Sequence, residues 1–325
     1  MKTPAFVPHP LLKHPQAQTT FAAFIASPVK LQRTLRLWVD MGDGDSLLLN
    51  EEPAEKDSSK KPLVIFLHGL GGSGDGSLIV RQSAKLNDLG YTALRFNHRG
   101  CGTEVKGRAK KIYHSGRTDD LIGTLKFLDK RWPGRPVLAV AYSLSGNILL
   151  RMLGSTDMKQ IPNLTAALAV CPPIDLEAAS HALSNPRNKH IDIFFSLLVT
   201  RQAFERERLL NQKPRAKLKY GLTLREFDEI YTAPEAGFAS RLEYYQKCSS
   251  APVLPKITLP TTILAAKDDP IIPAASLVDK VPSHITFRME DYGGHVGFYS
   301  ANVTEYGDRR WLDAYVLDWV QHNTP

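Results

Sequence analysis

A serine lies at an abrupt change of pattern in the stretch VLAVAYSLSGNILL, residues 137–150. The first half is apolar like a buried strand, the second half is apolar like a helix, and Ser143 joins them with almost no room for a turn. A serine at such a corner can be a nucleophile if the residues two positions away are small. Ala141 and Ser145 satisfy this condition. Centring the motif on Ser145 would place the larger Asn147 at one flank, so Ser143 is preferred.

The motif is weak alone, because a serine that merely caps a helix looks the same. A reactive serine also needs a base and an acid that orients the base. His295 lies in the glycine-rich stretch YGGHVGF, directly after the strand-like HITFRMED, and is the predicted base. The stretch ILAAKDDPIIP offers Asp268 and Asp269 at a strand end. Asp269 precedes Pro270 at the turn that leaves the sheet, so it is the predicted acid. Asp268 stays open, because aspartates often bond to local turns.

Backbone donors for a developing oxyanion are predicted in the stretch HGLGGSGDG, residues 68–76. This stretch follows the apolar LVIF, and its glycines permit close approach of the backbone. We predict that the N–H groups of Leu70 and Leu144 form the oxyanion hole. The stretch lacks the Gly-Lys-Ser/Thr ending of a phosphate-binding loop and the remainder of a dinucleotide fingerprint. Nucleotide binding is therefore not indicated.

The elements that must position these residues alternate between strand and helix patterns. This alternation predicts an α/β fold with a mostly parallel central sheet and helices on both faces. Around Asp43-Gly44-Asp45 the pattern predicts a hairpin instead. From about residue 174 to residue 250 the alternation stops, and a helical, basic pattern replaces it. We predict a single domain over residues 1–325, with residues 174–250 as a helical cap above the carboxyl ends of the strands.

Composition narrows the class of protein further. The 325 residues carry a formal net charge of +8, with basic clusters at 108–111 and 201–219. No nucleic-acid motif accompanies these clusters, so no nucleic-acid partner is predicted; peripheral contact with an anionic membrane is left open. No apolar run approaches the roughly 18 residues that span a bilayer. Three distant cysteines suggest neither a disulfide framework nor a metal site, and a reduced, cytoplasmic protein is expected.

Several stretches together resemble the YheT-like group of the α/β-hydrolase superfamily, predicted esterases that include animal abhydrolase-domain lipid hydrolases. The resemblance spans nearly the whole chain, and its stretches are HPQAQT, HGLGGSGDGSLI, FNHRGCG, AYSLSGN, FDEIYTAPEAGFASRLEYY, DDPIIP and GGHVGF. It implies the α/β-hydrolase fold, with Ser143 as nucleophile, Asp269 as acid and His295 as base, in the chain order of that fold. The family usually has GYSLGGN at the elbow, so Ala141 and Ser145 replace glycines. Ser145 is expected to tighten the elbow or to narrow the acyl site.

The expected activity is hydrolysis of carboxylic esters, small-molecule or lipid, through an acyl-enzyme, with no metal and no organic cofactor. Phospholipase activity and acyl transfer to an alcohol would use the same triad and stay open. A hydrolase fold that has lost its chemistry and only binds is a third alternative, although all three triad positions keep competent side chains. The apolar IDIFFSLLV, residues 191–199, is expected either to line an acyl pocket or to pack the cap on the core.

Overall fold

The computed structural model describes residues 3–24, 29, 31, 33–54, 60–102, 108–211 and 217–325. Within these residues the centre of the molecule is an eight-stranded sheet of order β1-β2-β4-β3-β5-β6-β7-β8. The strands are β1 (Leu35–Asp40), β2 (Ser46–Glu52), β3 (Leu63–Leu67), β4 (Ala93–Phe96), β5 (Val137–Tyr142), β6 (Leu164–Val170), β7 (Thr261–Ala266) and β8 (Thr286–Glu290). The neighbouring strands from β4 through β3 and β5 to β8 all pair in parallel. The pairs β1–β2 and β2–β4 are antiparallel. The predicted α/β class and the predicted hairpin are confirmed.

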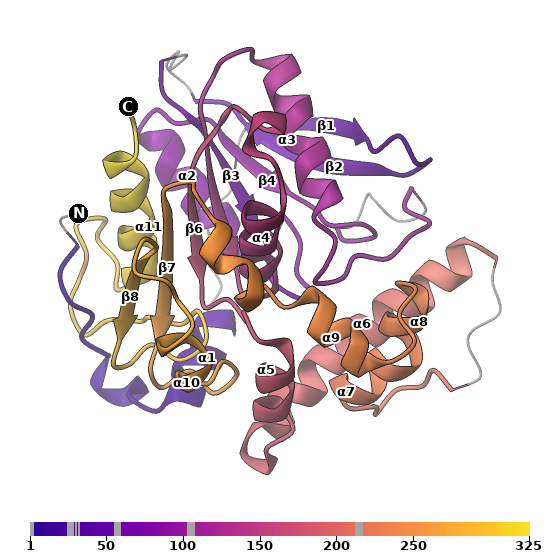
Figure 1. Cartoon of the computed structure of the whole chain (residues 1–325). Coiled ribbons are helices and arrows are strands. Elements are labelled where there is room, and N and C mark those ends of the chain that lie inside the picture. The colour runs from indigo at the N-terminus through magenta and orange to yellow at the C-terminus, as the bar shows by residue number, and fades with distance from the viewer. Residues whose placement is uncertain are drawn as a thin grey trace.

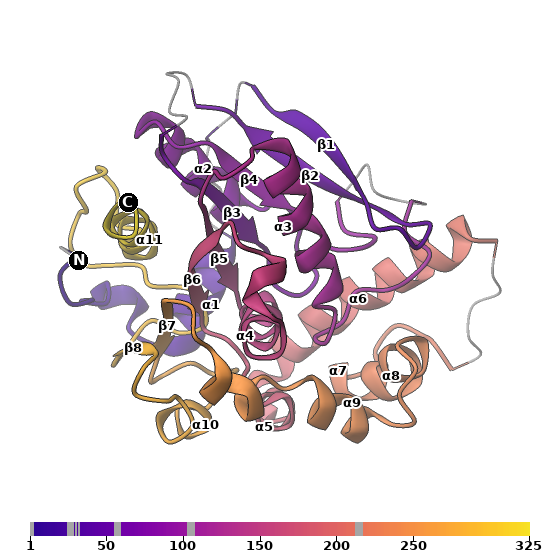
Figure 2. The same cartoon turned by 45° about the horizontal axis from the view of Figure 1, so that its top comes forward.

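The central strands are buried on both faces because helices cover both sides of the sheet (Figures 1 and 2). Along β3, Ile65 and Leu67 belong to the core that also holds side chains of α3 (Asp119–Arg131) and α4 (Leu144–Ser155). Val64 and Phe66 point the other way, into the core shared with α2 (Ser77–Asp88) and α11 (Trp311–His322). Alternate side chains therefore serve opposite cores, which is why these strands read as continuous apolar runs.

Five α-helices lie between β6 and β7 in the described part of the chain. They are α5 (Leu176–Leu183), α6 (Lys189–Leu209), α7 (Leu224–Phe227), α8 (Ala233–Glu235) and α9 (Arg241–Cys248). Figure 1 shows α6 to α9 grouped together beyond one end of the sheet strands, with α5 leading into them. These helices occupy the segment predicted as a cap. That the chain forms a single domain stays a prediction, and Lys213 and Arg215 of the basic cluster lie outside the described residues.

Two shorter helices complete the surroundings of the sheet. Helix α1 (Pro15–Phe24) was not predicted from the sequence, and α10 (Ala275–Val278) follows β7. Short 3-10 turns lie at Pro10–Leu12, Met158–Gln160, Pro186–Asn188 and Ala251–Lys256, and Asp228–Thr232 forms a π-helical turn. Among the described helices, none is both long enough and apolar enough to span a bilayer.

Candidate active site

Ser143 occupies a strained corner between β5 and α4. Its backbone has φ 50° and ψ −121°, a conformation that non-glycine residues rarely adopt. The Ser143 N–H donates to the carbonyl of Val170 on the next strand at 2.9 Å, which fixes the corner. Space is short on the helix side, since a Cβ on Gly146 would lie 2.9 Å from Cβ of Pro172. The predicted elbow therefore matches the geometry, and Ala141 fits within it fully buried.

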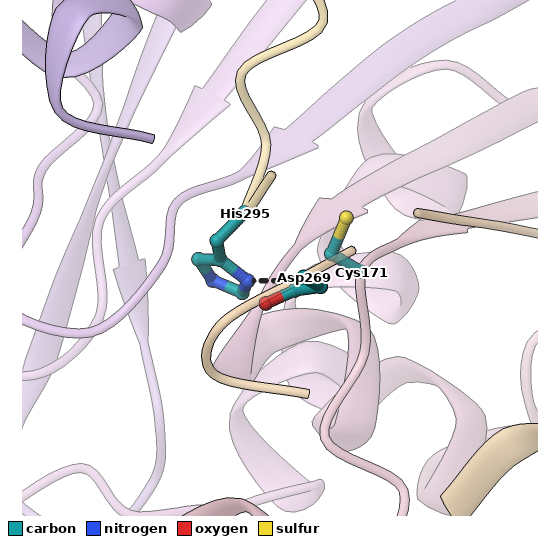
Figure 3. A group of neighbouring side chains, drawn as sticks. All are labelled: Cys171, Asp269 and His295. Atoms are coloured by element: carbon teal, nitrogen blue, oxygen red, sulfur yellow. Dashed lines mark hydrogen bonds and ion pairs between the residues drawn. The ribbon is translucent and has the colours of Figure 1, made fainter. Parts of the chain in front are cut away.

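The imidazole of His295 joins Ser143 to Asp269. Nε2 of His295 lies 2.8 Å from Oγ of Ser143, and Nδ1 lies 2.8 Å from Oδ2 of Asp269. His295 and Asp269 are both buried, while the Ser143 side is partly open. Figure 3 shows the ring of His295 facing the carboxylate of Asp269. The fold thus gathers three side chains that are distant along the sequence, in an arrangement able to activate a hydroxyl.

The two neighbouring aspartates have different surroundings. Oδ1 of Asp269 accepts hydrogen bonds from the N–H groups of Ile271 and Ile272 at 2.8 and 2.9 Å, which leaves Oδ2 for His295. Asp268 instead accepts from the N–H of Gly294 at 2.9 Å, and burial raises the pKa of this carboxyl. The structure places Asp269, the predicted acid, against the histidine, and Asp268, the alternative that stayed open, against its own loop.

The loop after β3 lies beside the nucleophile. A Cβ built on Gly69 would be 3.4 Å from Cβ of Ser143, so the backbone of this loop directly abuts the elbow. Leu70 and Leu144 line the same pocket as Ser143 and His295. The loop is fixed further along, where the N–H of Gly71 donates to the hydroxyl of Tyr113 at 2.9 Å. Both predicted oxyanion residues are therefore next to the nucleophile, and their role as donors stays a prediction.

Ser145 points away from the acyl site. Its side chain is fully buried, it donates to the carbonyl of His68, and its oxygen lies 2.6 Å from Nε2 of His98. The ring of His98 stacks on Tyr113, with centroids 5.0 Å apart and planes 14° apart. The expectation that Ser145 narrows the acyl site is therefore wrong, because this hydroxyl bonds to His68 and His98 instead of facing the pocket. The alternative, that Ser145 tightens the elbow, stays a prediction. His98 and Tyr113 were missed; the stretch FNHRGCG pointed to the first of them without giving it a role.

Cys171 lies beside Asp269 and His295, and this neighbour was not predicted from the sequence. Its sulfur, a carboxylate oxygen of Asp269 and a ring nitrogen of His295 lie within 4.8 Å of one another (Figure 3). Burial and the neighbouring Asp269 hold the pKa of the Cys171 thiol well above its usual value, so it stays protonated. Metals bind thiolates, and the carboxylate and imidazole already bond to each other. The residues therefore fit a metal poorly.

A largely apolar pocket opens from the nucleophile toward the helices between β6 and β7. Its apolar lining residues include Leu176, Leu183, Phe195, Val199, Leu209, Leu224, Phe227, Ile271 and Ile272. Both expectations for the stretch 191–199 hold in part. Phe195 and Val199 face the pocket, Ile191 packs in the sheet core, and Ile193 and Leu197 are exposed.

The stretch FDEIYTAPEAGF, which begins one of the longer motifs of the resemblance, forms one wall of this pocket. It begins after a helix start in which Thr223 and Glu226 cap each other reciprocally, and it contains the π-helical turn. Asp228 lines the pocket and accepts a hydrogen bond from the hydroxyl of Tyr245 at 2.6 Å. Burial raises the pKa of the Asp228 carboxyl to about 6. The wall therefore adds a titratable carboxyl to a pocket whose lining is largely apolar but also includes charged side chains such as Arg99 and Arg206.

Sheet order, strained elbow and histidine loop together define the class of protein. The family model described as the alpha/beta hydrolase fold matches residues 62–301, and the chain belongs to this family. It is 31% identical over 296 residues to the protein YheT of Escherichia coli (strain K12), which carries an esterase name; the match covers 88% of this chain and 83% of that protein. This similarity confirms the resemblance to the YheT-like group.

Two further comparisons agree with this assignment. Phospholipase ABHD3 of Mus musculus is 27% identical over 293 residues, covering 87% of this chain and 70% of the relative. Among solved structures, the esterase Pf2001 of Pyrococcus furiosus superimposes with a TM-score of 0.55 at 14% identity, covering 92% of this chain and 94% of the other. At this identity the superposition supports the fold alone.

Proposed function

We propose that the protein is a serine hydrolase of carboxylic esters. One observation carries the proposal: a single imidazole lies 2.8 Å from both the Ser143 hydroxyl and the Asp269 carboxylate, and Ser143 and His295 line a largely apolar pocket. A hydroxyl in this position can be deprotonated as it attacks a carbonyl. The esterase and phospholipase names of the relatives support the same reaction class.

In the proposed mechanism, Nε2 of His295 removes the proton of Ser143 as Oγ forms a bond to the ester carbon. The oxyanion accepts hydrogen bonds from the N–H groups of Leu70 and Leu144. Asp269 holds Nδ1–H of His295 and stabilises the imidazolium. The proton then passes to the leaving alkoxide as the C–O bond breaks, which leaves an acyl-enzyme. His295 then deprotonates a water molecule as its oxygen attacks the acyl carbon. The bond between this carbon and Oγ breaks, His295 returns the proton to Oγ of Ser143, and the acid leaves.

The proposed substrates are esters with an apolar acyl chain. Leucine, isoleucine, valine and phenylalanine side chains line much of the pocket that contains Ser143, and they favour burial of hydrocarbon. The phospholipase name of one relative makes a phospholipid the second candidate. Hydrolysis of p-nitrophenyl esters of increasing chain length, measured beside a phospholipid, separates the two. A cytoplasmic location and peripheral contact with an anionic membrane stay predictions.

The decisive test is covalent labelling of the nucleophile. A fluorophosphonate probe should label the wild type, and mass spectrometry should locate the adduct on Ser143. Ser143→Ala should lose the label and reduce ester turnover by roughly 10⁴- to 10⁶-fold. Folded protein that neither reacts with the probe nor turns over esters would favour the non-catalytic, binding alternative. Wild-type turnover in Ser143→Ala would place the reaction elsewhere.

A further inference from the structure

The stretch HPQAQT, residues 14–19, contributes nothing to the proposed triad, yet it forms the start of α1 and packs against the loop of His295. Both views place α1 close to β7 and β8, near the loop that follows β8 (Figures 1 and 2). Thr19 and His295 are 276 positions apart in the sequence but in direct contact. The segment therefore belongs to the surroundings of the site.

Thr19 holds the backbone of His295 itself. Its hydroxyl oxygen accepts a hydrogen bond from the N–H of His295 at 2.8 Å. The same hydroxyl donates to the carbonyl of Pro15 one helical turn earlier, also at 2.8 Å. Because both hydrogen-bonding functions are used, the oxygen is fixed in direction and the position of the His295 N–H is fixed with it.

Gln18 holds the loop four residues further on. Its Nε2 donates to the carbonyl of Tyr299 at 3.0 Å, and its Oε1 accepts from the N–H of Tyr299 at 2.8 Å. The Gln18 side chain is fully buried. A primary amide is suited to this contact, because it supplies a donor and an acceptor to the backbone of a single residue.

Between these two contacts the loop has an unfavourable backbone. Val296 has φ 60° and Phe298 has φ 45°, in the left-handed region that β-branched and bulky residues avoid. Such conformations persist only where surrounding contacts impose them. Thr19 lies at one end of this strained stretch and Gln18 at the other, so the contacts with α1 are suited to maintaining it.

The helix lies so close to the loop that two of the loop's glycines have no room for a Cβ atom. A Cβ on Gly294 would lie 2.5 Å from the carbonyl oxygen of Pro15, and a Cβ on Gly297 would lie 2.6 Å from that of Gln18. Glycine is therefore required on both sides of His295 for α1 to dock. The glycines of GGHVGF and the residues of HPQAQT fit each other as two parts of one contact.

We propose that Thr19 and Gln18 are positioning residues for His295. They hold the loop in the strained conformation that sets Nε2 of His295 at 2.8 Å from Ser143 while Nδ1 reaches Asp269. Thr19 acts through the backbone N–H and takes no part in proton transfer. The inference rests on the proposed function, because it gives α1 the task of orienting the catalytic base.

The test compares Thr19→Val, Thr19→Ser and the control Thr20→Val. Valine keeps the shape of threonine but removes both hydrogen bonds, serine keeps the hydroxyl, and Thr20 is the exposed neighbour on the same helix. Thr19→Val should lower kcat for a p-nitrophenyl ester by about 10- to 100-fold, with KM within about twofold, because small displacements of a catalytic group are costly. Thr19→Ser and Thr20→Val should stay near the wild type.

A second readout does not depend on turnover. The proton shared by Nδ1 of His295 and Asp269 should give a low-field proton NMR resonance in the wild type and in Thr19→Ser. In Thr19→Val this resonance should shift or broaden while the thermal unfolding temperature changes little. If Thr19→Val does not fold, Thr19→Ala replaces it in both measurements.

Two results would overturn the inference. One is wild-type kcat and an unchanged resonance in Thr19→Val. The other is a loss of kcat accounted for entirely by a smaller fraction of folded protein. Failure of the proposed function would give a result that differs from both of these, because the wild type itself would not react with the fluorophosphonate probe. The NMR resonance would then still report whether Thr19 orients His295.

Discussion

The hydroxyl oxygen of Ser145 lies 2.6 Å from Nε2 of His98, directly behind the nucleophile elbow. Ser145 donates its only hydroxyl proton to the carbonyl of His68, which can only accept. The proton between Ser145 and His98 must therefore belong to Nε2 of His98. Burial lowers the pKa of His98 well below its usual value, so the ring is neutral and its Nδ1 is bare. Among the described residues this Nδ1 indeed has no partner.

Ser145→Gly should destabilise the protein, although glycine is the usual family residue. The change leaves the carbonyl of His68 and Nε2 of His98 without a partner in a buried site, which costs about 1–3 kcal/mol of the free energy of unfolding. Since the loop predicted to supply an oxyanion donor begins at His68, kcat/KM should also fall by roughly tenfold. Urea unfolding and ester kinetics measure both effects. Ser155→Gly, an exposed change on the same helix, is the control, and equal effects of the two variants would contradict the role of Ser145.

The two aspartates should respond very differently to amidation. Asp269→Asn should lower kcat by about 10³- to 10⁴-fold, because an amide can present its N–H₂ to Nδ1 and favour the wrong tautomer of His295. Asp268→Asn should change kcat less than about tenfold, since an amide oxygen can still accept from the N–H of Gly294. Steady-state kinetics of the two variants provide the comparison. The reverse ranking would move the acid to Asp268.

Local pattern was enough to predict the sheet, the elbow and the histidine. Ser143 was predictable because a strand, a small-residue corner and a helix are contiguous in sequence. The sequence favoured Asp269 over Asp268 because Asp269 precedes Pro270, but the N–H groups that orient each carboxylate become visible only after folding. Ser145 and His98 are 47 positions apart, and no periodicity connects them. Thr19 and His295 are 276 positions apart, so a local sequence pattern could not predict their contact either.

Stability should fall in mild acid because His68 is buried. Burial lowers the pKa of His68 from 6.5 to about 4, so the unfolded chain binds a proton near pH 6.5 while the folded protein does so only near pH 4. The stability contributed by neutral His68 is present above pH 6.5 and is lost as the pH falls toward 4. The full loss is about 3 kcal/mol.

His68→Gln should remove this part of the pH dependence. Urea unfolding of the wild type and the variant at pH 7, 5.5 and 4.5 should give free energies of unfolding that converge as the pH falls. His284→Gln, the same replacement at an exposed position, is the matched control. Parallel curves for the wild type and His68→Gln would show that His68 is not the group responsible.

Replacement of Gly294 by alanine should be more harmful than the same replacement at another glycine with a positive φ. Gly294 has φ +57° and Gly237 has φ +82°, so an alanine at either position is strained by about 1–2 kcal/mol. Only at Gly294 would the new Cβ also collide with the carbonyl of Pro15. Gly294→Ala should therefore lose more stability than Gly237→Ala and lower kcat at least tenfold. Thermal unfolding with kinetics tests the pair, and similar values for both would show that α1 does not press on this loop.

Val199 should limit the length of acyl chain that the pocket accepts. This residue of α6 is buried and lines the pocket that contains Ser143 and His295. Val199→Trp fills part of that space, so kcat/KM for p-nitrophenyl decanoate should fall at least tenfold while that for the acetate stays within about threefold, because each displaced methylene loses binding free energy. The control is Val303→Trp on the exposed surface, which should leave both esters unaffected. A parallel loss for both esters would instead indicate damage to the triad, and unchanged decanoate hydrolysis would place the acyl chain elsewhere.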